Sequence, residues 1–191
     1  MNLASRPWIA AAILGLLALS PAYAGMTPEE VKAFEGYKLL AEKGDPVAQA
    51  SLGYCYDNGE GVTKDQAQAV TWYRKAAEQG RAVAQFNLGY CYANGNGVAK
   101  DEVRAVSWYS KAAVQGYALA QSNLGLCYAK GKGVAKDEIE AYAYWNLAGV
   151  TDEVARENLT ILEKMMSPDA RLLGQQRTKQ LQKEITANLD F

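Results

Sequence analysis

The sequence predicts an all-α fold, a right-handed α-solenoid of stacked helix pairs, from three observations. A strict 36-residue period runs through the middle of the chain, each unit carries the apolar spacing of two helices, and glycine pairs separate those helices. The 191 residues are 49% hydrophobic and 21% charged, as in ordinary globular proteins. Such helix pairs bury their apolar faces by stacking on their neighbours.

Residues 1–24 have the layout of a secretory signal peptide. A short first region with Arg6 precedes an apolar run over 8–19. The AYA at 22–24 then offers the small residues that signal peptidase requires, and cleavage is expected after Ala24. A membrane anchor is the alternative, but about 12 apolar residues are fewer than the roughly 20 that span a bilayer. No cysteine precedes Cys55, so there is no lipobox. We expect a periplasmic or secreted protein with no membrane span after cleavage.

Residues 25–44 are expected to form a single helix, the second half of an incomplete repeat. Thr27, Pro28 and Glu30 supply an N-cap, a first-turn proline and a capping-box glutamate. The string AFEGYKLLAEKG at 33–44 falls in register with AVTWYRKAAEQG one period later. The chain is therefore expected to open with an N-terminal half-repeat.

Three full repeats follow, at 45–80, 81–116 and 117–150. They are defined by identical residues at a constant step of 36 positions, without insertions. The repeated positions include Gln49, Gln85 and Gln121; Gly53, Gly89 and Gly125; and Cys55, Cys91 and Cys127. A period of this length predicts one supersecondary unit per repeat.

Each repeat is expected to hold two helices. In the first helix Ala48, Leu52 and Cys55 recur at i, i+4 and i+7, which is one helical face, and Gly59 ends it. The second helix starts at Asp65, a natural N-cap, and ends at Gly80, where a left-handed residue is favoured.

The second helices also carry capping-box patterns. Gln68 stands three residues after Asp65, and Glu140 stands three residues after Asp137. Each can complete a capping box with its aspartate. The middle repeat has an arginine at this position, so its box is expected to be incomplete.

These residues resemble the Sel-one-like repeat (SLR) family, which is related to the tetratricopeptide repeats. The frame A-x-x-x-L-G-x-x-Y-x-x-G-x-G-V-x-x-D-x-x-x-A-x-x-W-Y-x-K-A-A-x-x-G is followed almost throughout by 48–80 and 84–116. The third copy departs after Asp137, where Tyr144 replaces the tryptophan. The resemblance implies a solenoid of SLR helix pairs and a scaffold that binds other proteins, often in the cell envelope.

Residues 151–191 are expected to form C-terminal capping helices over 152–166 and 168–188. Leu173, Leu181 and Ile185 could place the last helix on the open end of the stack. Such caps keep the last core layer of a solenoid from solvent.

The three cysteines are expected to be packed, reduced thiols. Equivalent positions lie one helix-packing step of about 8–10 Å apart with nearly parallel side chains, whereas a disulfide needs Cα atoms within about 7 Å. A bridge or an oxidation sensor is the alternative, and thiols strung along a solenoid cannot converge on one metal ion. SLR relatives with two cysteines per repeat staple their helix pairs, but this chain has one per repeat.

Composition excludes most catalytic and nucleic-acid chemistry. The net charge is -1, so no basic surface holds nucleic acid, and the chain has no histidine to act as a base or metal ligand. The GxGV segments lack the strand and lysine of a phosphate loop and are interpreted as turns. Trp72 and Trp108 are interpreted as repeat core and not as a ligand cage. We expect no enzyme, no cofactor and no metal.

A polar stripe on the first helices is the candidate partner site. It faces away from the leucines and is predicted to line the concave side, although an ordinary solvated face is the alternative. Its members are Ser51, Tyr54, Asn58, Asn87, Tyr90, Asn94, Asn123, Leu126 and Lys130. Asparagine amides can hydrogen-bond a peptide backbone, and tyrosines add rigid contact area.

The sequence thus predicts an exported, monomeric scaffold that binds a protein or peptide of the bacterial envelope. The alternative is a cell-wall-related enzyme or a penicillin-interacting protein, because cysteine-rich SLR relatives are linked to such ligands. The missing cysteine pairs and the absence of a nucleophile–base motif favour the scaffold.

Overall fold

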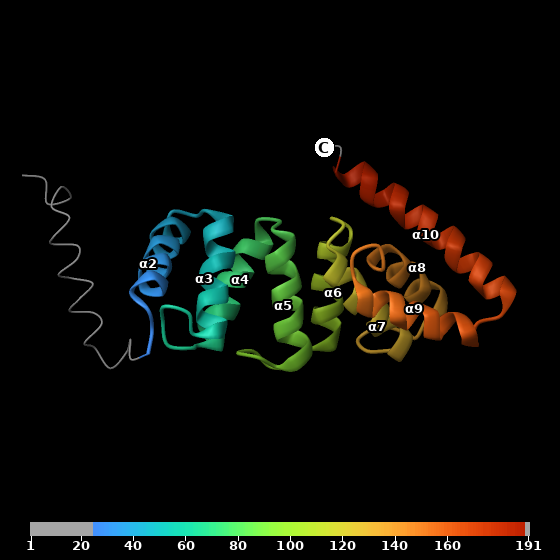
Figure 1. The fold of residues 1–191 in the computed structure, drawn as a ribbon, viewed down its shortest axis with the longest axis horizontal. Coiled ribbons are helices and arrows are strands. Elements are labelled where there is room, and N and C mark those ends of the chain that lie inside the picture. Colours follow the sequence, from blue (N-terminus) through green and yellow to red (C-terminus); the bar gives the residue numbers. More distant parts are fainter. Residues whose placement is uncertain (1–24, 190–191) are drawn as a thin grey trace, which may run out of the picture. The chain divides into compact units, whose positions relative to one another are not determined.

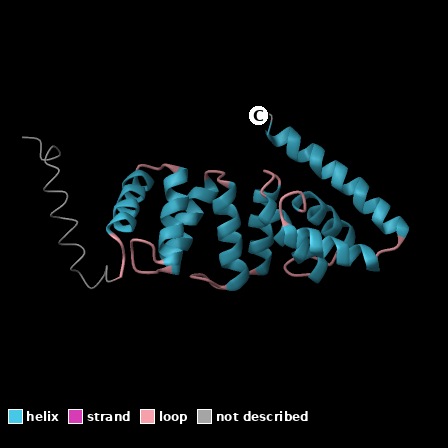
Figure 2. Ribbon diagram, in the orientation of Figure 1, coloured by secondary structure: helices cyan, strands magenta, loops and turns pink. Residues whose placement is uncertain are grey.

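The computed structural model describes residues 25–189, and within them the chain forms nine α-helices and no strand (Figure 1, Figure 2). The expected signal peptide at 1–24 lies outside the described residues. The helices are α2 (Pro28–Glu42), α3 (Pro46–Asn58), α4 (Gln66–Glu78), α5 (Ala82–Asn94), α6 (Glu102–Ala113), α7 (Ala118–Lys130), α8 (Glu138–Ala148), α9 (Glu153–Met165) and α10 (Pro168–Leu189).

Contacts divide the chain into two compact units, Met1–Ala76 and Ala77–Phe191, with the boundary near the end of α4. In the second unit α5 pairs with α6, α7 pairs with α8, and α6 packs on α7. The predicted all-α solenoid of helix pairs is confirmed. None of the helices in the described part of the chain is long and apolar enough to cross a bilayer.

In the first unit, α2 packs on α3 around Phe34, Ala41, Leu52 and Cys55. The half-repeat helix begins as the sequence predicts. The Thr27 hydroxyl accepts from the Glu30 amide at 3.2 Å, and the Glu30 carboxylate accepts from the Thr27 amide at 2.7 Å. This reciprocal capping box fixes the start of α2.

Glycines set the distance between the two helices of a repeat. A Cβ at Gly89 would lie 2.8 Å from the ring of Tyr109, and a Cβ at Gly125 would lie 2.7 Å from the ring of Trp145. In the first unit Gly53 meets the ring of Tyr73 in the same way. The repeated glycine therefore lets an aromatic side chain of the second helix lie directly on the first.

Two of the GxGV turns, in the first and third repeats, pack against the start of an earlier helix. Gly61 has a left-handed φ of +68° and lies against the backbone of Glu30, and Gly133, at +70°, lies against the backbone of Glu102. A larger residue would clash with that backbone, and its Cβ would also disfavour the left-handed φ, so both positions require glycine. These contacts support the interpretation of the GxGV segments as turns.

A buried glutamine joins consecutive helices in every repeat. The Nε2 atoms of Gln49, Gln85 and Gln121 donate to the carbonyls of Ala41, Ala77 and Ala113 at 3.1–3.2 Å. Each of these carbonyls, at the end of the preceding helix, also accepts from the amide of the glycine three residues later, so the glutamine adds a second hydrogen bond to it. The glutamines that define the period in the sequence are thus structural.

The last helix covers α8, with two departures from expectation. Leu181 and Ile185 are buried as predicted, but Leu173 is 53% exposed because its neighbour Gly174 takes the contact with the Tyr142 ring. Glu140 does not complete a capping box. Its carboxylate instead accepts from Arg177 of α10 at 2.6 Å, which ties α10 to α8.

Cysteines and tryptophans are only partly as expected. Cys55 and Cys91 are buried, whereas Cys127 is half-buried because a cavity leaves its side open. Trp72 and Trp108 are also half-buried, and the ammonium groups of Lys75 and Lys111 lie 3.9 and 4.1 Å from their ring centroids. These lysines shield the tryptophans from solvent.

Candidate protein-binding site

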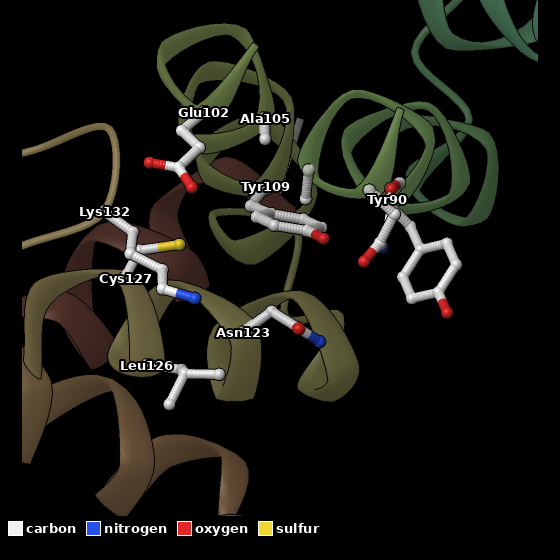
Figure 3. Close-up of a pocket in the computed structure, with 10 residues that line it drawn as sticks. Tyr90, Glu102, Ala105, Tyr109, Asn123, Leu126, Cys127 and Lys132 are labelled. Atoms are coloured by element: carbon white, nitrogen blue, oxygen red, sulfur yellow. Dashed lines mark hydrogen bonds between the residues drawn. The ribbon is translucent and has the colours of Figure 1, made fainter. Parts of the chain in front are cut away.

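The second unit contains a cavity of about 170 Å³ between α5, α6 and α7, which we call the Tyr109 cavity (Figure 3). Four residues of the predicted stripe line it, namely Tyr90, Asn94, Asn123 and Leu126. The remaining lining residues are Ala93, Glu102, Ala105, Tyr109, Cys127 and Lys132. The solenoid geometry therefore brings part of the stripe together around one concavity.

Tyr109 forms the floor of this cavity. Its side chain is 2% exposed, and no hydrogen bond joins its hydroxyl to another lining residue. Burial, and then the nearby titratable groups of Cys127, Tyr90 and Cys91, raise the pKa of Tyr109 above its usual range. The hydroxyl thus stays protonated and can donate a hydrogen bond to a group that enters the cavity.

Two opposite charges and a thiol lie on one side of the Tyr109 ring. Figure 3 shows the Glu102 carboxylate and the Lys132 side chain beside the Cys127 sulfur. Glu102 is also paired with Lys100, whose Nζ lies 2.9 Å from its Oε1. The cavity therefore offers a hydrogen-bond acceptor and a cation to an entering polar group.

The chemistry of Cys127 does not suit nucleophilic catalysis. Burial, and then the negative charge of Glu102, raise the pKa of Cys127 to about 11, although Lys132 acts in the opposite direction. The reactive form of cysteine is the thiolate, which is scarce at neutral pH when the pKa is so high. The chain has no histidine that could serve as its base.

A second hollow, the Val154 hollow, lies beside the cavity and holds about 230 Å³. Asn123 and Leu126 line both concavities, so the two share one wall. The other lining residues are Leu119, Ser122, Asp152, Val154 and Asn158. Leu119 and Val154 are large apolar side chains that are 47% and 60% exposed.

A third hollow, the Met165 hollow, holds about 220 Å³ and shares Asn158 with the second. Ile161 and Met165 of α9 line it and are 58% and 76% exposed. Its other lining residues are Ala129, Lys130, Lys136, Glu138, Trp145 and Leu162. Shared lining residues thus connect the three concavities along α7. Most of the large exposed side chains that line the two hollows are apolar.

The stripe asparagines are arranged differently from the expectation. The Nδ2 atoms of Asn123, Asn94 and Asn58 donate to carbonyls four residues earlier in their own helices, at 2.8, 2.9 and 3.1 Å. One amide proton of each is therefore already engaged. The carbonyl oxygen and the second amide proton remain for a ligand.

The structure separates the other predicted site residues. Lys130 lines the Met165 hollow, and Asn87 is half-buried on α5 and lines none of the three concavities. Ser51, Tyr54 and Asn58 lie on α3 in the first unit, where Tyr54 is 50% exposed. The cavity and hollows are all in the second unit.

Several residues that line the concavities could not be predicted from the sequence. Tyr109 belongs to the repeated WY pair and is core by its periodicity, so its hydroxyl gives no signal of a cavity. Glu102 and Lys132 occupy positions that vary between repeats, and α9 lies outside the repeats. In the part of the chain that the structure describes, no group of three or more His, Cys, Asp or Glu side chains could hold a metal.

Comparison with known proteins identifies the repeat. The Sel1 repeat model matches residues 46–80, 82–117 and 118–149, more than half of the chain. The chain belongs to the Sel1 repeat family. Sel1 repeat proteins are generally scaffolds for protein–protein interaction, and the family fold is not a catalytic one.

Two solved structures resemble the chain. A protective antigen of uropathogenic Escherichia coli with an SLR fold is 33% identical, with a TM-score of 0.78 over 93% of this chain and 38% of its own. A Sel1 repeat protein from Oxalobacter formigenes is 42% identical, with a TM-score of 0.61 over 66% of this chain and 96% of its own. The chain spans 38% of the antigen's length. No curated protein is similar enough to count as a match.

Proposed function

We propose that this Sel1 repeat protein is an exported scaffold that binds an extended segment of a partner protein in the bacterial envelope. The observation that carries the proposal is the row of three connected concavities along α7. Their shared walls offer a continuous path, and an extended peptide follows such a path with alternate side chains directed into hollows.

The chemistry of the row defines the segment that it suits. The Val154 and Met165 hollows expose Leu119, Val154, Ile161 and Met165, which favours large apolar side chains at these two points. The Tyr109 cavity suits a polar side chain or a backbone group, since the Tyr109 hydroxyl and the charged side chains of Glu102 and Lys132 line it. The partner segment therefore carries a polar position followed by two apolar ones, or the same order reversed.

Leu126 is the centre of the proposed site because it lines both the Tyr109 cavity and the Val154 hollow. Replacing Tyr90, Asn123 and Leu126 together by alanine should weaken capture of the envelope partner at least about tenfold, since 1.4 kcal/mol corresponds to tenfold. The partner is first isolated from envelope extract with the unaltered protein as bait, and its affinity for each variant is then measured.

A matched control is available on α10. Leu172 and Leu173 are 54% and 53% exposed and line none of the three concavities. The Leu172→Ala, Leu173→Ala variant removes comparable apolar area and should bind normally. Equal losses in the two variants, with helix content unchanged, would show that the α7 row is ordinary surface.

The export part of the proposal rests on residues 1–24. The charged start, the apolar run and the AYA at 22–24 support removal of this segment during secretion. The intact mass of protein from the periplasm or the medium should correspond to a chain that begins at Gly25. Protein retained in the membrane fraction with Met1 still present would refute export as a soluble protein.

A further inference from the structure

Among the residues that the structure describes, none packs against the glycine in the middle of α2. The other glycines inside the described helices each face an aromatic ring, in the pairs Gly53–Tyr73, Gly89–Tyr109, Gly125–Trp145 and Gly174–Tyr142. A Cβ added at Gly36 would instead meet no atom of the described residues within 4 Å. Glycine destabilises a helix interior relative to alanine. Gly36 therefore lacks the aromatic ring that packs on each of the other four helix glycines.

The face of α2 that carries Gly36 corresponds to a buried face in the full repeats. One period of 36 residues relates Tyr37 to Tyr73 and Leu40 to Ala76. Tyr73 is 1% and Ala76 is 0% exposed, but Tyr37 is 38% and Leu40 is 48% exposed. In a full repeat the preceding first helix covers this face, and among the described residues no helix precedes α2. Within the described residues, the face thus has the form of a helix-packing surface with no helix packed on it.

We propose that a second copy of this chain covers the open face, with the two α2 helices packed antiparallel and crossing at Gly36. An exposed aromatic side chain, Tyr37, stands directly beside the unfilled glycine. In a two-fold arrangement Tyr37 of each copy reaches Gly36 of the other, so each copy supplies what the other lacks. Leu40 and the exposed Ala33 flank this contact on both copies.

Charge complementarity sets the direction. Glu29 and Lys43 lie seven residues before and seven residues after Gly36. An antiparallel pair that crosses at Gly36 places Glu29 of one copy beside Lys43 of the other at both ends, whereas a parallel pair places like charges together. Both side chains are exposed, so the ion pairs fix orientation more than affinity.

The expected assembly is thus a dimer and not the monomer expected from the sequence. The face lies in the first unit and shares no residue with the three concavities of the second, so the dimer and the partner site can be tested separately. Binding of the envelope partner does not enter the experiment.

The test is the mass of the purified protein by sedimentation equilibrium, from about 1 to about 100 μM, a span that brackets a micromolar interface. The unaltered protein should change from monomer to dimer within this range. Gly36→Gln should raise the dimer Kd at least about tenfold, because the side chain blocks the crossing. The same variant should raise the Tm of the monomer by about 1–4 °C, since glutamine is the better helix former.

Charge exchange supplies the matched variants. Glu29→Lys and Lys43→Glu should each raise the dimer Kd about threefold, and the double exchange should return it to within about twofold of the original. Glu35→Lys makes the same change of charge on another side of α2 and should leave the Kd unchanged. Tyr37→Ser repeats the test without altering Gly36.

Two results would overturn the proposal. One is a monomer at every concentration, which would leave the α2 face to solvent or to a different protein. The other is a dimer whose Kd is unaffected by both Gly36→Gln and Tyr37→Ser, which would place the interface elsewhere.

Discussion

Glycines inside the repeat helices are explained by the aromatic side chains that face them. Gly89 lies in the middle of α5, where a helix former would be favoured by propensity alone, yet the Tyr109 ring occupies the space of its Cβ. A Cβ at Gly36, in contrast, would meet no atom of the described residues within 4 Å. The two glycines therefore make a matched pair for substitution.

Gly89→Ala should destabilise the fold by about 1–3 kcal/mol, because the added methyl group overpacks against the Tyr109 ring. The higher helix propensity of alanine should offset roughly 1 kcal/mol of this loss. Gly36→Ala should instead stabilise it by about 0.5–1 kcal/mol. Urea unfolding at a concentration where the chain is monomeric compares the two. Stabilisation by both changes would show that the Tyr109 ring moves aside freely.

The thiols should differ in reactivity according to burial. Cys55 and Cys91 are buried, and Cys127 is half-buried beside the cavity. Burial raises the pKa of Cys55 to about 11, helped by the negative charge of Glu60, and Cys127 has the same value. Alkylation at pH 8 should therefore be slow at all three sites and should label Cys127 first.

Peptide mass mapping after timed alkylation checks the order. Denaturant should make all three thiols react at the same rate. Labelling of Cys91 ahead of Cys127 in the folded protein would contradict the packing described for α5 and α7. Fewer than three free thiols after denaturation would contradict the reduced state expected from the repeat geometry.

Raised thiol pKa values also predict a loss of stability in alkali. A thiol whose pKa is higher in the folded than in the unfolded state favours folding fully below the unfolded value of about 9. That contribution falls as the pH rises from there toward the folded value of about 11. For buried Cys55 the loss is at most about 2–3 kcal/mol.

Urea unfolding of Cys55→Ala at pH 7 and pH 10 measures this contribution. The variant should be less stable than the unaltered protein at pH 7, because a buried group is lost, but its stability should fall less toward pH 10. Parallel pH profiles for the two proteins would argue against the raised pKa.

At the scale of elements, α10 is held to α8 by a nearly buried ion pair. The Glu140 and Arg177 side chains are 20% and 26% exposed, and the second oxygen of Glu140 is buried without a hydrogen-bond partner. Arg177→Met leaves this carboxylate without its cation and should destabilise the second unit by about 1–3 kcal/mol.

The matched control is Arg171→Met, at an exposed position of the same helix. It should change stability by less than about 0.5 kcal/mol. Adding Glu140→Gln to Arg177→Met should recover part of the loss, because the uncompensated charge is removed. Equal effects of Arg177→Met and Arg171→Met would mean that the pair contributes nothing to docking of α10.

Element boundaries were predictable because local chemistry sets them. Asp65, Asp101 and Asp137 each accept hydrogen bonds from amides at the start of the next helix, and Gly59, Gly95 and Gly131 end the preceding ones in the left-handed conformation. Side-chain partners across elements were not predictable in this way. Glu140 fits a capping box in sequence, but the nearby guanidinium of Arg177 offers the stronger charge-assisted bond.

At the scale of the whole molecule, the 36-residue period predicts the solenoid fold but does not predict where the concavities lie. Repetition predicts which positions recur on one face, and four members of the predicted stripe do meet in the Tyr109 cavity. The concavities themselves are lined by residues at positions that differ between the repeats or lie outside them. Glu102 and Lys132 vary between repeats, and α9 follows a repeat-breaking sequence with an exposed apolar face. A pattern of equal units cannot predict features that only one unit has.

The central claim, that the row of concavities along α7 receives a partner segment, is tested most directly by site-specific photo-crosslinking in cells. A photoreactive amino acid replaces Leu126, at the shared wall of the Tyr109 cavity and the Val154 hollow, and in a matched strain it replaces Leu172 on α10. We predict one discrete adduct from position 126 that is absent from position 172. It should disappear when Tyr90 and Asn123 are also changed to alanine. An adduct of equal yield from position 172, or none from position 126 in cells where the protein still co-purifies with its partner, would contradict the claim.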